Sequence, residues 1–179
     1  MRLGTYLLIG ACLSTTISTA WAEDLYTVTW ESPSEGPSGS MPLGNGAYGI
    51  NLWVEPNGEI CFYVSGSGAW SGNARLLKLG RVRISLTPTP FRENTPFRQV
   101  LDTRRGVATL VFGEPDEETR VEIWVDALYP AIRVYMQSAL PRRMRAVAET
   151  WRTAPRELLP EERGSAYGLA ESGKPIMVE

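Results

Sequence analysis

The chain has 179 residues, with 18 basic and 20 acidic side chains, and its formal net charge of −2 lacks the positive excess typical of nucleic-acid-binding proteins. It contains no histidine and two cysteines, Cys12 and Cys61. The absence of histidine excludes Ser-His-Asp and Cys-His catalysis and imidazole metal ligands. The cysteines are too few for a thiolate zinc site. Hydrolytic chemistry would have to use carboxylates, Tyr, Lys or a carboxylate-bound metal, and we expect no metal and no cofactor.

The first residues predict a secretory signal over residues 1–22. Arg2 gives a basic start, the stretch from Leu3 to about Ala20 is mostly apolar, and Ala20-Trp21-Ala22 fits the small-x-small cleavage rule. A membrane anchor is disfavoured because Ser and Thr residues interrupt the apolar stretch, and lipidation at Cys12 is an alternative. We therefore expect export to the periplasm or beyond, with no membrane segment after cleavage and Cys61 as the remaining thiol.

The stretch from Ser40 to Trp70 predicts a glycine-rich loop, Gly44–Gly49, followed by a β-hairpin. Apolar and polar residues alternate on both sides of Glu55-Pro56-Asn57-Gly58, whose composition is typical of a turn. With Leu52 and Phe62 placed in the core, the opposite face carries Asn51, Trp53, Glu59, Cys61 and Tyr63. This second face is too aromatic to be covered by solvent alone.

Further strands are predicted along the chain. Residues 65–73 are interpreted as a second glycine loop, and residues 142–152 as a strand, with a helix as the alternative. The other predicted strands cover residues 25–30, 80–86, 97–101, 107–112, 119–128 and 131–137.

These elements predict an all-β fold, an antiparallel β-sandwich over residues 23–152, with a barrel as the alternative. Residues 153–179 are rich in Pro, Gly and Glu and are interpreted as a connector or as incomplete C-terminal strands. The apolar residues Ile176, Met177 and Val178 suggest a strand cut short, so the sandwich is expected to be truncated at its C-terminal end.

Three residues are candidates for binding a substrate. Gly44-Asn45-Gly46 has no Gly-Lys-Ser/Thr and precedes a predicted strand, which argues against a phosphate loop. It is either a tight loop that uses glycine conformations or a loop that approaches a ligand, with Asn45 offering an amide. Trp70 lies among glycines, where its indole could stack on a sugar ring, and Asn73 follows it.

Paired carboxylates could hydrolyse a glycoside if one of them had a raised pKa. The carboxylates on or beside predicted strands are Glu55, Glu59, Asp102, Glu122 and Asp126. Their simplest role is a solvated face, and no pair among them is favoured as catalytic.

Several runs carry a family resemblance over residues 30 to about 150. The loop from Pro42 to Gly49 (PLGNGAYG) and the later Trp70-Ser71-Gly72 resemble the N-terminal β-sandwich of fucosidase-type inverting glycoside hydrolases. Together with Leu76–Val82 and Pro96–Asp102, they also look like an uncharacterised bacterial N-terminal domain.

The resemblance implies an exported polysaccharide-degrading protein in which such a sandwich packs on an (α/α)6-barrel. In that family the catalytic carboxylates sit in the barrel, and the sandwich contributes loops to the rim of the active site. This chain has no barrel, so the expected function is a module that is not catalytic by itself. The alternatives are a free-standing carbohydrate-binding module and a structural envelope domain with no ligand.

Overall fold

The computed structural model describes residues 25–71, 75–92, 94–151, 153–165 and 177–178. The signal sequence predicted over residues 1–22 lies outside them. The described part contains strands and two short 3-10 helices, η1 (Pro37–Gly39) and η2 (Pro160–Ser165), and it shows no α-helix. Accordingly, it includes no helix long and apolar enough to cross a membrane.

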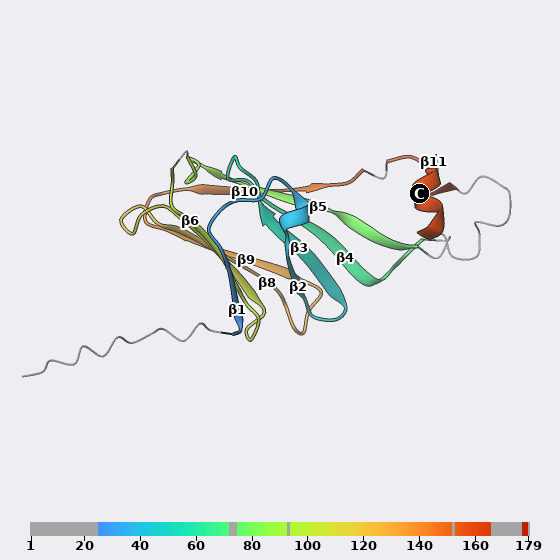
Figure 1. Ribbon diagram of the computed structural model, residues 1–179, viewed down its shortest axis with the longest axis horizontal. Coiled ribbons are helices and arrows are strands. Elements are labelled where there is room, and N and C mark those ends of the chain that lie inside the picture. The colour runs from blue at the N-terminus through green and yellow to red at the C-terminus, as the bar shows by residue number, and fades with distance from the viewer. Residues whose placement is uncertain (1–24, 72–74, 93, 152, 166–176, 179) are drawn as a thin grey trace, which may run out of the picture.

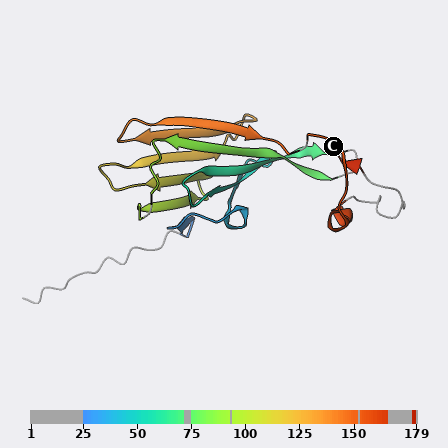
Figure 2. The ribbon, with the colours of Figure 1, turned by 90° about the horizontal axis from the view of Figure 1, so that it is seen from above.

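Ten of the strands form two five-stranded antiparallel sheets (Figures 1 and 2). Sheet A has the order β1-β6-β7-β8-β9 and sheet B the order β10-β5-β4-β3-β2. The strands of sheet A are β1 (Thr27–Trp30), β6 (Phe97–Asp102), β7 (Val107–Phe112), β8 (Thr119–Val125) and β9 (Ile132–Ser138). Those of sheet B are β2 (Met41–Gly44), β3 (Tyr48–Val54), β4 (Ile60–Trp70), β5 (Leu76–Thr87) and β10 (Arg143–Glu149). The predicted antiparallel β-sandwich is confirmed.

The core lies between the inner faces of the two sheets, because the strands alternate apolar and polar residues with the period of a pleated sheet. In β8, Val121 and Ile123 are fully buried, whereas the alternate residues Glu122 and Trp124 are only partly buried. The largest core residues include Met41, Leu52, Ile60, Phe62, Ile84, Leu110 and Phe112.

The β3–β4 hairpin has the register that its apolar pattern predicts. Leu52 lies opposite Phe62, and the backbone N–H of Gly58 donates to the carbonyl of Glu55 over 2.8 Å. Gly58 has φ of 83°, a conformation that glycine adopts without steric cost.

One segment predicted as a loop is a strand. Met41–Gly44, for which no strand was predicted, forms β2 and pairs with β3, whereas residues 65–70, interpreted as part of a glycine loop, continue β4 and pair with the start of β5. The glycines and serines there indicated a loop, but register shifts between β4 and β5 accommodate them in a strand, as β-bulges commonly do. The resulting β4–β5 hairpin reaches out of the sandwich towards the C-terminal segment (Figures 1 and 2).

The ambiguous segment 142–152 contains β10, which pairs with β5, so the strand interpretation is confirmed. Beyond it, β11 (Arg156–Glu157) pairs with β12 (Met177–Val178), and η2 follows β11 in the chain. Glu162 of η2 lies 3.7 Å from Arg75, which immediately precedes β5. This ion pair joins the C-terminal segment to the projecting hairpin.

Candidate functional site

The β2–β3 turn is organised by the side chain of Asn45. Its Oδ1 accepts hydrogen bonds from the backbone N–H groups of Ala47 and Tyr48, at 3.0 and 2.8 Å. Its Nδ2 donates to the backbone oxygen of Asp126, the residue that follows β8 of sheet A, 2.7 Å away. Gly46 has φ of 90°, so the interpretation of a tight loop with a positive-φ glycine fits this turn. Both ends of the Asn45 amide therefore hold the loop in place.

Trp70 lies at the end of β4 and is 58% exposed. Its Nε1 donates to the carbonyl of Ser67 over 2.8 Å, and the Ser67 N–H donates to the carbonyl of Ala47, also over 2.8 Å. Ser67 thus connects Trp70 to the turn that contains Asn45. The indole is anchored through its nitrogen, while much of the ring surface remains accessible.

Two other exposed apolar side chains lie along the same part of β4. Leu76 is its partner across β4 and β5 and is 56% exposed, and the Tyr48 ring lies beside Gly66. We call this surface the rim and define it as Asn45, Tyr48, Ser67, Trp70 and Leu76. The third predicted residue, Asn73, lies outside the described residues.

The outer face of sheet B carries a second packed layer, as its aromatic composition predicted. Trp53 and Cys61 are fully buried although they do not belong to the core between the sheets. The Tyr63 ring packs on Trp53 with a centroid distance of 5.1 Å, and the Trp151 ring packs on Tyr63 at 5.7 Å. Burial, followed by the nearby charge of Glu55, raises the pKa of the Cys61 thiol to about 12.

Beside this layer, Arg83 gathers three carboxylates. Its Nη1 donates to Glu59 over 2.6 Å and to Glu55 over 3.0 Å, and its Nε donates to Glu149 over 3.0 Å. Glu149 also accepts from Arg81. The hydrogen bonds donated by Arg83 and Arg81 lower the pKa of Glu149, and the bonds that Arg83 donates, first to Glu149 and then to Glu55 and Glu59, raise the pKa of Arg83.

Glu55 and Glu59 were among the predicted candidate carboxylates, whereas Arg83 and Glu149 were not predicted as site residues. The signal was present in the alternation of β5, where Arg81 and Arg83 share the face opposite Val82 and Ile84. The partner strand β10 was ambiguous in sequence, so Glu149 could not be placed on that face.

The remaining candidate carboxylates form local contacts. Glu122 pairs with Arg120 at 2.9 Å and Asp126 with Arg133 at 3.1 Å, while Asp102 accepts backbone hydrogen bonds from residues 104 and 105. Hydrogen bonds from the backbone of Leu128 and Tyr129, and then from Arg133, lower the pKa of Asp126. A glycosidic general acid needs a raised pKa, so the downward shifts of Asp126 and Glu149 suit structural ion pairs better.

Within the residues that the structure describes, no group of three or more Cys, Asp or Glu side chains is arranged to hold a metal ion.

A comparison with family models identifies the family of this chain. The model of a domain of unknown function (DUF5703) matches residues 29–179, which is most of the chain, so the chain belongs to that family. No curated protein matches it.

Proposed function

We propose that this member of the DUF5703 family is a non-catalytic β-sandwich module of an exported glycoside hydrolase-like protein and that its rim contributes to a carbohydrate site. The observation that carries the proposal is the exposed, anchored indole of Trp70. Sugar rings stack on indoles through their apolar C–H faces. An indole fixed through its nitrogen loses little conformational freedom when a sugar binds.

The partner in this proposal is an (α/α)6-barrel domain that supplies the catalytic carboxylates. Its support is the resemblance of Pro42–Gly49 and Trp70-Ser71-Gly72 to the sandwich of fucosidase-type glycoside hydrolases. The positions of these runs also support it. Pro42–Gly49 forms the β2–β3 turn region, and Trp70 is connected to this turn through Ser67. Rim residues on a hairpin that projects from the sandwich could reach the edge of a neighbouring active site.

The coding sequence downstream of residue 179 tests the module hypothesis. We expect an in-frame region that encodes a helical barrel, and its absence contradicts the proposed partner. Purified chain assayed with aryl glycosides should show no turnover. Hydrolysis that persists through purification and is absent from a mock preparation would overturn the non-catalytic assignment.

The alternative is a free-standing carbohydrate-binding module, which is favoured by the fact that Trp70 is already anchored without a second domain. Calorimetric titration with oligosaccharides distinguishes the two functions. A stand-alone module binds as purified and loses binding in Trp70→Ala, whereas Tyr129→Ala, which removes an aromatic ring that is 60% exposed elsewhere, leaves it unchanged. If the rim is instead part of a site shared with a barrel domain, oligosaccharides bind only when that barrel domain is present.

A further inference from the structure

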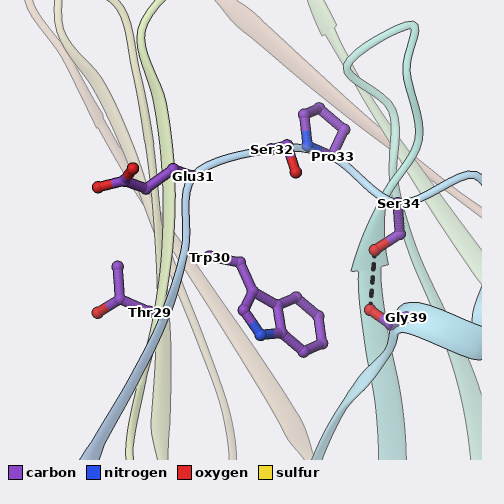
Figure 3. Close-up of a pocket in the computed structure, with 7 residues that line it drawn as sticks. All are labelled: Thr29, Trp30, Glu31, Ser32, Pro33, Ser34 and Gly39. Atoms are coloured by element: carbon purple, nitrogen blue, oxygen red, sulfur yellow. Dashed lines mark hydrogen bonds between the residues drawn. The ribbon is translucent and has the colours of Figure 1, made fainter.

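The edge strands of the two sheets differ in how open they are to a further strand. A sheet edge presents unpaired backbone N–H and C=O groups, and proteins protect it with proline, short strands or inward-facing charges. At one edge of sheet B, β2 carries Pro42. At one edge of sheet A, β1 has four residues, and the chain then passes to the segment in which the Ser34 hydroxyl donates to the carbonyl of Gly39 (Figure 3). The edge strands β9 and β10 have seven residues each and contain no proline.

Beyond its open edge, β10 exposes the side of sheet B that faces the core. In its register with β5, Met144 lies opposite Leu86 and Ala146 opposite Ile84. Leu86 and Ile84 are buried, whereas Met144 is 38% exposed and Ala146 and Ala148 are exposed as well. This inner face of β10 carries no charge. The packed core therefore ends at β5, and β10 extends beyond it with an uncovered apolar face.

The outer face of β10 carries charges of both signs. Arg143 and Arg145 lie near its start and Glu149 at its end. The two arginines are exposed and make no hydrogen bond or ion pair within the described part of the chain. Glu149 already accepts hydrogen bonds from Arg81 and Arg83, but its side chain is 30% exposed and a carboxylate can accept about four. The two ends of the strand are therefore oppositely charged.

We propose that two copies of this chain form a symmetric dimer through antiparallel pairing of β10 with β10 of the second copy. Two identical antiparallel strands are related by a two-fold axis, so pairing over the whole of Arg143–Glu149 is centred on Ala146. Arg143 of each copy then lies opposite Glu149 of the other. On the inner face, Met144 lies opposite Ala148, so a large side chain meets a small one.

Charge favours this register over its neighbours that keep the apolar faces together. A two-fold axis at Arg145 would place Arg145 opposite its own copy, and like charges directly opposite each other destabilise a pair of strands. An axis at Val147 would leave the start of β10 unpaired. With the axis at Ala146, Arg145 has both Arg145 and Glu149 of the second copy as diagonal neighbours, so its net contribution is small. Sheet B then becomes one continuous sheet with five strands from each copy.

Sedimentation equilibrium of the purified chain tests the dimer. We expect the average mass to rise from that of the monomer to that of the dimer with increasing protein concentration. Arg143→Glu should raise the dimer Kd about tenfold, because it replaces two opposite-charge pairs with two like-charge pairs. The matched control is Arg98→Glu, which makes the same change of charge on β6 inside sheet A and should leave the Kd unchanged. Trp70→Ala in the rim should also leave it unchanged, because the dimer does not depend on the proposed function.

Cysteine cross-linking tests the register. In a Cys12→Ser background, Ala146→Cys places one new thiol of each copy opposite the other, with the Cα atoms about 4.5–5.5 Å apart, a separation that a disulfide spans. With oxidised glutathione as the oxidant, this variant should form covalent dimers. Ala148→Cys is the control and should not cross-link, because its counterpart in the second copy lies at least about 13 Å away along the strand.

Three results would overturn the proposal. A chain that stays monomeric at every concentration would show that a second copy does not cover β10 and that its partner strand belongs to a different protein segment. Equal cross-linking of Ala146→Cys and Ala148→Cys would contradict the two-fold axis at residue 146. An Arg143→Glu variant that dimerises as tightly as the wild type would show that the association does not use this edge.

Discussion

Asn45 donates a hydrogen bond from its side-chain nitrogen to the backbone oxygen of Asp126, 2.7 Å away, and so connects the β2–β3 turn of sheet B to the end of β8 in sheet A. The same side chain caps two backbone N–H groups of its own turn. A residue first considered as a ligand contact therefore joins the two halves of the sandwich.

Asn45→Ala should destabilise the domain by about 1–2 kcal/mol, because it removes the cross-sheet bond and frees the turn. Urea unfolding measures the change through the transition midpoint. Asn57→Ala is the matched control, since Asn57 makes comparable bonds only to Glu59 within its own hairpin turn. Equal losses in the two variants would show that the connection between the sheets adds nothing.

Local patterns predicted most of the sandwich, because burial on one face imposes a period of two on each strand. The alternation of Val121, Ile123 and Val125 sufficed for β8. The extension of β4 to Trp70 was missed because its glycines and serines have low strand propensity on their own. Pairing with β5, which includes the Trp70–Leu76 pair, provides the stabilisation that the local sequence lacks.

The candidate sites were less predictable, because their geometry depends on contacts between distant segments. Asn45 and Trp70 were identified by residue type, but the bond from Asn45 to Asp126 spans 81 residues of sequence. The segment around η1 is held to sheet B by the hydrogen bond from the Ser34 N–H to the carbonyl of Val54, which lies 20 residues further along the chain. Neither contact has a signature in the local sequence.

The two tryptophans of the β3–β4 hairpin should respond differently to truncation. Trp53→Ala should cost about 3–5 kcal/mol, because Trp53 is fully buried on the outer face of sheet B. Trp70→Ala should change stability by no more than about 0.5 kcal/mol, because its indole is mostly exposed. Urea unfolding compares them directly, and a Trp53→Ala variant as stable as Trp70→Ala would contradict the second packed layer.

Cys61 should be inert in the folded protein. It is fully buried and its pKa is raised to about 12, so the reactive thiolate is scarce and inaccessible. The reactivity of Cys61 is measured by labelling with a thiol reagent at a pH near the usual thiol pKa of about 8.5. The experiment uses a Cys12→Ser background so that Cys61 is the thiol counted. We expect labelling to follow the unfolded fraction as urea is added, and rapid labelling of the native protein would contradict the burial of this strand.

The carboxyl group of Glu162 should titrate far below its ordinary range. Hydrogen bonds from Arg156, at 2.7 Å to each carboxylate oxygen, and from the Leu159 N–H hold its pKa at about 2 instead of 4.5. A depressed folded-state pKa contributes stability above the unfolded value of 4.5 that is lost as the pH falls through about 2. The carbon chemical shift of the Glu162 carboxyl, followed by NMR between these values, gives the pKa directly.

Replacing Arg156 with Gln should move the pKa of Glu162 back towards 4.5, because the first and largest cause of the depression is removed. The matched control is Arg133→Gln, which removes the charged partner of Asp126 and does not contact Glu162. That variant should raise the pKa of Asp126 and leave Glu162 where it was. A wild-type Glu162 that titrates near 4.5, or one that is insensitive to Arg156→Gln, would mean that η2 is not held against β11 in solution.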